Sequence, residues 1–406
     1  MIKKLFLSIS IQSIGTLSSF ALVWLITHYL GLEKQGEFAI LKSWIDLWIV
    51  IGCFGLPQGF IYAINKLKAP IQPLKKFSTY YPIALIFITT IASFIWFRLI
   101  NKSITLLPLQ YLLIGIAIAG IVGHGLLRGI YLTQNDGNLF AFVSILPALS
   151  LFLLTIITTI ISKNVSFPEI YILSGCLSFA IVFPLIKTHE TTQKQIIPWQ
   201  KIIANGNSVF LQGLAVTLLP VCTYWLMHEF DMTQKEIGGF NIAMYFYLAI
   251  ALPLNMIAPI FFNRWSKTNE NSLLKQELKK FISIGIWIIP FSLLLFYFTP
   301  HIIMFFFGKE TSFIITTAQV FILSSIIIYL NNILSCMNLS IGNFTKNSIY
   351  YISKNVLTIF FVFIALKLFS HELIYIAYSW ALGDIILLGM LSISIKQFFK
   401  NKRTTA

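Results

Sequence analysis

Apolar stretches long enough to cross a lipid bilayer follow one another along almost the whole chain. A hydrocarbon core about 30 Å thick takes roughly 20 helical residues. We expect twelve membrane-spanning helices, at residues 5–30, 37–64, 77–100, 106–132, 138–161, 168–187, 205–228, 237–262, 281–300, 311–342, 346–369 and 371–395. The stretches are continuous, whereas the strands of a β-barrel would alternate and span about ten residues. The sequence therefore predicts an all-α polytopic membrane protein.

Composition and charge support this fold class and indicate an orientation. Apolar residues make up 57% of the chain and charged residues 11%, against about 45–50% and about 25% in soluble domains. Of the 29 Lys and Arg residues, 20 are expected on the same side of the membrane as the N-terminus: Lys3, Lys4, Lys66, Lys68, Lys75, Lys76, Arg128, Lys187, Lys194, Lys201, Arg264, Lys267, Lys275, Lys279, Lys280, Lys346, Lys396, Lys400, Lys402 and Arg403. Because such residues accumulate in cytoplasmic loops, both termini are predicted to be cytoplasmic, with the chain in a bacterial inner membrane. Anionic membrane lipids, rather than nucleic acid, are the expected partners of this positive face.

The two halves of the chain show a faint internal repeat. At an offset of 202 residues Gly36 matches Gly238, Phe38 matches Phe240, and Pro57 matches Pro259. Six helices in each half would make both halves enter the membrane from the same side, as in transporters built from parallel repeats. We therefore expect two six-helix bundles, residues 1–200 and 201–406, that alternate around a central polar cavity.

The first seventy residues carry a recognisable opening. The first helix ends in Tyr29, Leu30 and Gly31, four residues separate this Gly from Gly36-x-Phe-Ala, and the next helix closes with the run 52–57 before Asn65 and Lys66. This opening resembles the polysaccharide or O-antigen repeat-unit (Wzx-type) flippases of the multidrug, oligosaccharidyl-lipid and polysaccharide exporter superfamily. Chain length and helix number extend the resemblance across the whole sequence.

The resemblance implies a transporter rather than an enzyme. Its substrate would be an undecaprenyl-diphosphate-linked oligosaccharide, moved from the cytoplasmic to the periplasmic leaflet, and its partners would be membrane lipids and the polysaccharide polymerase machinery. No phosphate-binding loop of the Gly-x-x-x-x-Gly-Lys-Ser/Thr type is present, so we expect no nucleotide cofactor. The energy would come from a gradient of a coupling ion, H⁺ or Na⁺, or from the concentration difference of the lipid-linked substrate itself.

Three alternatives share parts of this pattern. An O-antigen polymerase would also be polytopic and basic, but it would need a large extracytoplasmic loop, which the predicted loops do not provide. A drug exporter and a flippase for a lipid-linked peptidoglycan precursor belong to the same superfamily. Helix spacing alone does not separate these two from the polysaccharide flippase.

Charged residues inside the predicted helices are the first candidates for substrate binding. Lys42 and Asp46 lie four positions apart on one helical face, where Lys42 would meet a phosphate and Asp46 would carry a proton; the alternative is a lysine that reaches the headgroups beside a local hydrogen-bond network. Lys354 and Asp384 lie on consecutive antiparallel helices and are expected to pair, either as a transport site or as a structural pair.

A second group of candidates is cationic or amide-bearing. Arg128 lies four residues after His124. Its planar guanidinium would donate two hydrogen bonds to the diphosphate, or it would only anchor the helix end at the membrane surface. Gln12, Gln212 and Asn241 suit sugar hydroxyl groups, although interhelical hydrogen bonds would use the same amides. The four cysteines have no metal-ligand spacing and are expected to pack as apolar residues.

Overall fold

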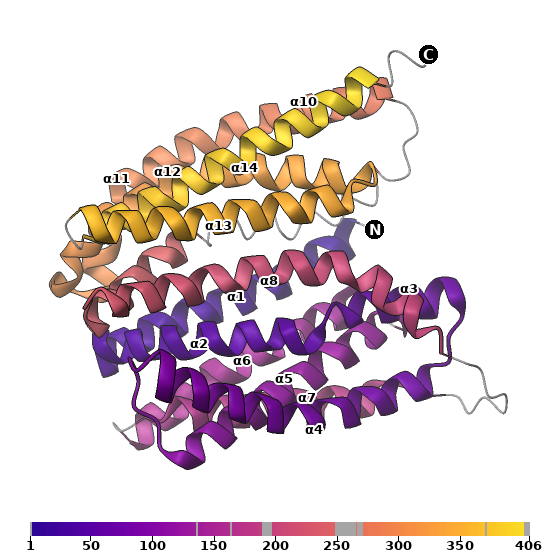
Figure 1. Cartoon of the computed structure of the whole chain (residues 1–406), viewed down its shortest axis with the longest axis horizontal. Coiled ribbons are helices and arrows are strands. Elements are labelled where there is room, and N and C mark those ends of the chain that lie inside the picture. The colour runs from indigo at the N-terminus through magenta and orange to yellow at the C-terminus, as the bar shows by residue number, and fades with distance from the viewer. Residues whose placement is uncertain are drawn as a thin grey trace. The chain divides into compact units, whose positions relative to one another are not determined.

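The computed structural model describes residues 2–134, 137–162, 165–188, 197–247, 265, 271–369 and 372–401. Within these residues the chain is helical, and 11 helices are long and apolar enough to cross a membrane (Figure 1). Residues 234–247 are also helical and begin the helix predicted at 237–262, whose remainder lies outside the described residues. The structure therefore confirms the all-α membrane fold class.

The chain divides into two compact units, Met1–Thr217 and Leu218–Ala406, which we call unit 1 and unit 2. The division falls inside helix α8, whereas the boundary predicted from the sequence, 200/201, falls near the start of that helix.

Unit 1 is built around helix α5. Its helices are α1 (Ile2–Leu30), α2 (Leu32–Cys53), α3 (Leu56–Leu67), α4 (Ile71–Ile95, extended by a π-helical turn, Trp96–Ile100), α5 (Pro108–Gln134), α6 (Gly137–Ile161), α7 (Phe167–Leu185) and the first part of α8 (Trp199–Glu229). A fully buried row of apolar side chains runs along α5 at four-residue spacing: Ile114, Ile118, Val122, Leu126 and Ile130. Helix α5 packs against α4 and α7, and α1 packs against α6.

The helix predicted at 37–64 is wrong as one continuous element, because the structure breaks it into α2 and α3. Phe54 (φ 46°) and Gly55 (φ 68°) both adopt the left-handed conformation at the break. Glycine takes this conformation at little cost, and Pro57 removes a main-chain donor in the first turn of α3. Hydropathy cannot reveal the break, because the stretch remains apolar across it.

Unit 2 contains the rest of α8, the helical residues 234–247, α10 (Asn271–Ile284), a 3₁₀ turn (Gly285–Trp287), α11 (Ile288–Phe307), a 3₁₀ helix (Lys309–Ile314), α12 (Ile315–Ser340), α13 (Phe344–Leu368) and α14 (Leu373–Asn401). The helix predicted at 281–300 is also corrected: it is preceded by the amphipathic α10. Leu274 and Leu278 of α10 are buried in the core, whereas Lys275 and Lys279 are exposed. The lysines lower the hydropathy of this segment and hide the helix.

The two units share part of their helix packing. Counting α2 with α3, and α10 with α11, the fourth and sixth helices of unit 1 pack together as α5 and α7, and those of unit 2 as α12 and α14. The third and fourth helices pack as α4 with α5, and as α11 with α12. This agreement supports the parallel internal repeat.

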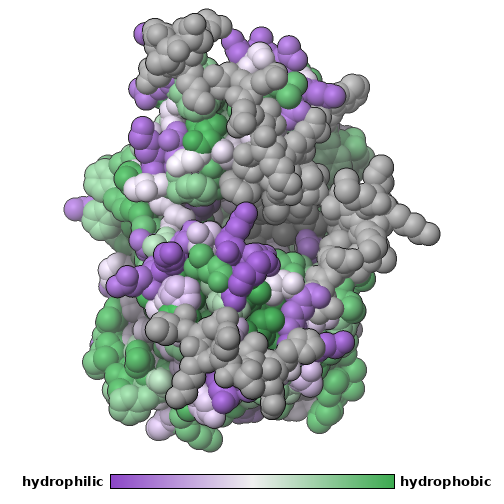
Figure 2. Space-filling model, turned by 90° about the vertical axis from the view of Figure 1, so that its right-hand side faces the viewer, coloured by the Kyte–Doolittle hydropathy of each residue, from purple (hydrophilic) through white to green (hydrophobic). Residues whose placement is uncertain are grey.

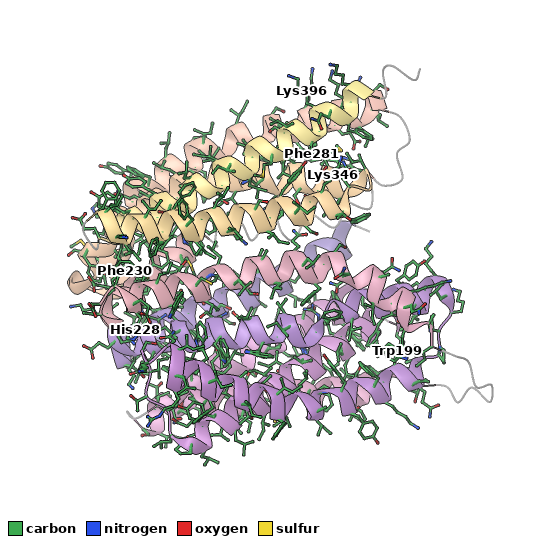
Figure 3. The ribbon with its side chains drawn as sticks, in the orientation of Figure 1. Trp199, His228, Phe230, Phe281, Lys346 and Lys396 are labelled. Carbon is green, nitrogen blue, oxygen red and sulfur yellow. The ribbon has the colours of Figure 1, made fainter. Side chains whose placement is uncertain are left out.

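Lys346 and Lys396 lie at one end of unit 2, whereas His228 lies at the other (Figure 3). The face in Figure 2 shows hydrophilic side chains gathered between flanks that are mostly hydrophobic. A bundle with apolar flanks and polar ends is what a bilayer environment requires.

Candidate functional site

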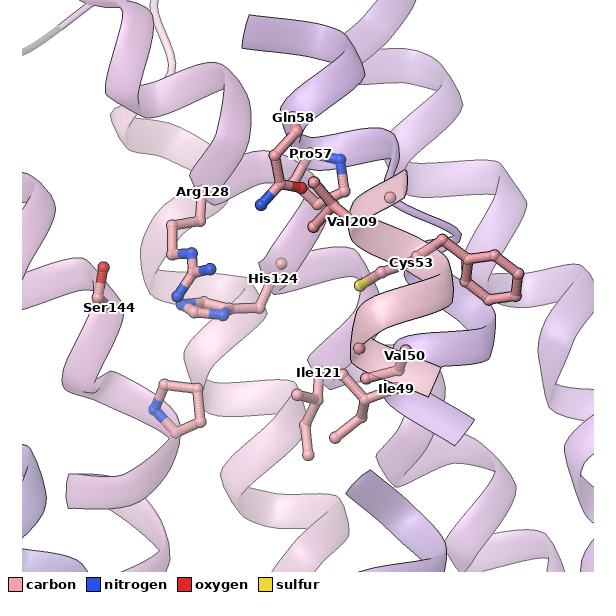
Figure 4. A pocket seen from close by; sticks show the side chains of 15 residues that line it. Ile49, Val50, Cys53, Pro57, Gln58, Ile121, His124, Arg128, Ser144 and Val209 are labelled. Atoms are coloured by element: carbon pink, nitrogen blue, oxygen red, sulfur yellow. The ribbon is translucent and has the colours of Figure 1, made fainter. Parts of the chain in front are cut away.

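A cavity of about 270 Å³ lies within unit 1, between α2, α3, α5, α6 and the first part of α8 (Figure 4). Most of its wall is apolar. Its polar lining residues are Cys53, Gln58, His124, Arg128 and Ser144. Arg128 and His124 project toward the open space from neighbouring turns of α5 (Figure 4).

Arg128 places a positive charge in this cavity without a matching acid. Among the described residues no carboxylate lies within ion-pair distance of its guanidinium, which lies 5.8 Å from the centroid of the Phe140 ring. The neighbouring His124 is buried, and its Nε2 lies 3.0 Å from the main-chain O of Val143. A nitrogen facing a carbonyl oxygen carries a proton, so His124 Nε2 donates to Val143. Among the residues that line the cavity, Arg128 is the one that is always charged.

The break in the second predicted helix forms one wall of the cavity. Gly55, Pro57 and Gln58 line it from the first turn of α3, where main-chain N–H groups have no partner inside the helix. Helix α8 approaches this turn closely: a Cβ added to Gly206 would lie 2.6 Å from the main-chain O of Gly55. Backbone N–H groups, the helix dipole and Arg128 all favour an anion at this wall.

Lys42 and Asp46 form an ion pair on α2, as their spacing suggests. Their side chains are 33% and 41% exposed. They lie on the helical face that continues into Ile49, Val50 and Cys53, which line the cavity. The pair therefore shares a face of α2 with the cavity wall, and it is not sealed inside unit 1.

Gln12 and Gln212 are partly buried, on α1 and α8 respectively. Neither amide side chain is hydrogen-bonded to a described residue. Gln212 adjoins Gly213, which lines the cavity. Both amides are thus available for a ligand.

The remaining candidates belong to unit 2 and do not line this cavity. Lys354 Nζ lies 3.0 Å from Asp384 Oδ1, which confirms the predicted pairing of α13 with α14. Tyr247 donates a hydrogen bond to Asp384 Oδ2 at 2.7 Å. Asn241 is buried and accepts a hydrogen bond from Tyr224 at 3.0 Å.

Gln58 and Asn331 are among the polar residues of these sites that were not predicted from the sequence. Gln58 lies directly after Pro57, and its position became informative only once the helix break was known. Asn331 donates a hydrogen bond to the main-chain O of Asp384 at 2.9 Å. The sequence feature that could have identified it is the two adjacent asparagines, residues 331 and 332, inside an apolar stretch. Among the described residues no cluster of His, Cys, Asp and Glu could hold a metal ion.

Sequence comparison identifies no relative: no family model and no curated protein matches the chain. Solved structures do match. The lipid II flippase MurJ, in an inward closed conformation, has a TM-score of 0.78 and 16% identity over 96% of this chain and 87% of its own. A multidrug resistance MATE family transporter of the MOP superfamily, in an inward-facing conformation, has a TM-score of 0.77 and 14% identity over 99% of this chain and 100% of its own.

A third match is the Vibrio cholerae MATE transporter VcmN, with a TM-score of 0.71 and 10% identity over 98% of this chain and 97% of its own. All three matched proteins are transporters or flippases rather than enzymes. At these identities the likeness concerns the fold. The chain is a multi-pass membrane protein with the fold of the MOP-superfamily transporters.

Proposed function

We propose that this chain is a flippase that moves an undecaprenyl-diphosphate-linked oligosaccharide, such as an O-antigen or other polysaccharide repeat unit, across the bacterial inner membrane. The observation that carries the proposal is the cavity of unit 1, where Arg128 has no acidic partner among the described residues. An uncompensated cation inside an apolar bundle is costly, and an anionic ligand offsets that cost. The fold shared with a flippase of a lipid-linked substrate supports the same substrate class.

The cavity residues divide the recognition of such a ligand between them. Arg128 binds the diphosphate with two parallel N–H donors, and the first turn of α3 adds main-chain N–H groups. The apolar wall, including Ile49 and Phe210, accommodates the first part of the lipid chain. Because one fixed cation and one helix terminus act together, the headgroup is held by its phosphates rather than by a particular sugar.

The sugars require polar groups outside the cavity. The Lys42–Asp46 pair, Gln12 and Gln212 supply charged and amide groups from unit 1. Substrate would cross by alternating access of the two units, with both chain termini in the cytoplasm and the polymerase machinery receiving the product. Either an ion gradient or the gradient of the lipid-linked substrate would drive the movement.

A drug exporter is the second candidate, because the MATE structures match almost as well as MurJ does. The charge of the cavity separates the two functions. Arg128 disfavours a cationic drug and favours an anionic headgroup.

The test is complementation of a bacterial strain that lacks its own polysaccharide flippase. Wild type, Arg128→Ala, Arg128→Lys and Arg98→Ala are compared at equal membrane levels. Arg98 is the matched control, because it lies in the exposed π-helical turn after α4 and does not line the cavity. Surface glycan and the sidedness of lipid-linked repeat units are measured together.

We expect wild type and Arg98→Ala to restore surface glycan. Arg128→Ala should leave lipid-linked units in the cytoplasmic leaflet. If units reach the outer leaflet without this chain and fail only to polymerise, the flippase proposal is wrong and a polymerase replaces it. If wild type lowers the sensitivity of the strain to cationic drugs but restores no glycan, the drug-exporter function replaces it.

A further inference from the structure

Helix α10 carries three lysines on the outside of unit 2 (Figure 1). Lys275, Lys279 and Lys280 are exposed. Leu274 and Leu278 of the same helix are buried in a core that residues of α12 and α14 complete. Helix α10 therefore has an apolar face that packs inside unit 2 and a basic face on the surface of that unit.

The charge of this basic face is not compensated within the described part of the chain. The ammonium groups of Lys275, Lys279 and Lys280 form no ion pair with a described residue. Glu277 is the one acidic residue in the sequence of α10, and its carboxylate accepts a hydrogen bond at 2.8 Å from Nε1 of the buried Trp265. The acid of α10 thus bonds to the core, and the lysines keep their charge for a partner outside unit 2.

The corresponding helix of unit 1 uses its lysine differently. Lys75, near the start of α4, donates a hydrogen bond to the main-chain O of Ile186 at 3.0 Å. Its ammonium also lies 4.3 Å from the centroid of the Phe183 ring. Both contacts hold Lys75 against the end of α7. A lysine that helps to orient a membrane helix can therefore be bound by the protein itself, whereas the lysines of α10 are not.

The length of this helical stretch places α10 at the level of the lipid headgroups. The stretch Ser272–Phe307, which joins α10 to α11, has 36 residues. At 1.5 Å per residue it is about 54 Å long, against a hydrocarbon core of about 30 Å. Since α11 is apolar almost throughout, the excess of about 24 Å falls on the polar α10. Helix α10 therefore extends from the edge of the hydrocarbon through the headgroup layer.

Two of the lysines and two exposed isoleucines follow one another along α10 toward α11. Lys275 and Lys279 are four residues apart and share one face of the helix. Ile282 follows three residues later, Ile286 continues toward α11, and both are exposed. Positive charge thus comes first and apolar surface second, in the direction that leads into the membrane. An anionic phospholipid has the same order, with its phosphate in the headgroup layer and its acyl chains below.

We propose that Lys275, Lys279, Ile282 and Ile286 form a binding site for an anionic phospholipid of the surrounding bilayer, which we call the α10 lipid site. The two ammonium groups bind the phosphate through charge-assisted hydrogen bonds, and the isoleucines pack along the first part of one acyl chain. The site adds named residues to the general attraction between a basic membrane face and anionic lipids. It belongs to unit 2 alone and does not depend on which substrate unit 1 binds.

The test is thermal unfolding of the full-length purified protein in detergent, with added phosphatidylglycerol, phosphatidylcholine or glycerol 3-phosphate. Wild type is compared with the double variants Lys275→Gln with Lys279→Gln, and Lys66→Gln with Lys68→Gln. The second variant is the matched control, because Lys66 and Lys68 are exposed at the end of α3 and their replacement removes the same charge. They are two positions apart and do not share a helical face, so they cannot bind one phosphate together.

At about 100 times its Kd, phosphatidylglycerol should raise the wild-type midpoint by about 2–4 °C, whereas the other two additives should not. The Lys275→Gln, Lys279→Gln variant should lose most of this rise, and the control should keep it. Equal rises with phosphatidylglycerol and phosphatidylcholine would overturn the proposal, and so would equal rises in the two double variants.

Glycerol 3-phosphate tests whether the acyl chains contribute. It carries the phosphate without the acyl chains, so a rise as large as that with phosphatidylglycerol would assign the lysines to a soluble anion and also overturn the proposal. Lys279→Gln alone replaces the double variant if the latter fails to fold, with Lys66→Gln as its control. The single variant should lose part of the rise that the control retains.

Discussion

The Lys42–Asp46 ion pair of unit 1 and the Lys354–Asp384 ion pair of unit 2 differ in where their two charges lie. Lys42 and Asp46 share one helix, α2, and both side chains are about a third exposed or more. Lys354 and Asp384 join two helices, α13 and α14, and both are almost fully buried. The first pair can exchange partners without moving a helix, whereas the second cannot.

The contrast extends to the charge that each unit leaves uncompensated. Unit 1 adds Arg128 in a cavity with no acidic partner among the described residues, whereas unit 2 neutralises Lys354 with Asp384. Two units that share part of their helix packing thus use charge differently. Unit 1 has charge available for a ligand, and unit 2 uses charge to join its own helices.

The largest effect is expected for Lys354→Ala. This change leaves Asp384 buried without its cation, and we expect a loss of about 3–5 kcal/mol in the free energy of unfolding. Thermal or denaturant unfolding of the purified protein measures it. The double variant Lys354→Met with Asp384→Leu should recover most of the loss, because it removes both charges together. If Lys354→Ala were as stable as wild type, the Lys354–Asp384 pair would not stabilise unit 2 more than the Lys42–Asp46 pair stabilises unit 1.

A smaller effect, on binding rather than on folding, is expected for Arg128→Ala. Loss of charged hydrogen bonds to the diphosphate should weaken ligand binding by about 10- to 100-fold, that is about 1.5–3 kcal/mol. Arg128→Lys should retain part of the affinity, because it keeps the charge but not the planar fork.

Cys53 provides the readout for this change, since its thiol lines the same cavity as Arg128. In a variant whose other three cysteines, Cys176, Cys222 and Cys336, are replaced by alanine, an undecaprenyl-diphosphate-linked oligosaccharide should protect Cys53 from a maleimide. Arg128→Ala should require a correspondingly higher ligand concentration. Unchanged protection would remove Arg128 from the binding site.

The next effect concerns the close approach of α3 and α8 in unit 1. Gly206→Ala would place a Cβ against the main chain of Gly55, and the resulting shift should cost about 1–3 kcal/mol of stability. Gly389→Ala in α14 is the matched control: nothing lies within 4 Å of its added Cβ, so it should be neutral or stabilise by up to about 1 kcal/mol. Equal unfolding midpoints for the two variants would show that the α3–α8 contact is not tight.

The smallest effect on stability is expected for Lys42→Ala and Asp46→Asn. A partly exposed pair within one helix contributes less than about 1 kcal/mol. If these residues serve the substrate, transport should fall while the unfolding midpoint stays near that of wild type. A loss of stability comparable to that of Lys354→Ala would mean that the two pairs do not differ as described.

The membrane fold followed from the sequence because continuous apolar stretches leave a chain few alternatives to spanning helices. The pairing of Lys354 with Asp384 also followed, since consecutive helices run antiparallel. The break at Phe54 and Gly55 is missing from the helix predicted at 37–64, because hydropathy shows no gap in a stretch that is apolar throughout; the signals for it are Gly55 and Pro57 in the run that closes the helix.

The cavity could likewise not be predicted from the sequence. Arg128 was recognisable as a candidate, but its neighbours Gln58 and Cys53 come from other helices, and helix packing decides which side chains meet. The hydrogen bond from Asn331 to the main-chain O of Asp384 likewise joins two helices, α12 and α14. Spacing along one helix identifies shared faces, whereas only the packed bundle shows which faces meet.

Translocation of a lipid-linked oligosaccharide can be measured with the purified chain in liposomes. The purified chain is placed in liposomes that contain a fluorescent undecaprenyl-diphosphate-linked oligosaccharide, and a membrane-impermeant quencher is added outside. We predict that wild type makes nearly all of the fluorescence accessible, whereas Arg128→Ala leaves the inner-leaflet half protected, as empty liposomes do. Equal protection in wild-type and empty liposomes would contradict the proposal that this chain moves a lipid-linked oligosaccharide across the membrane.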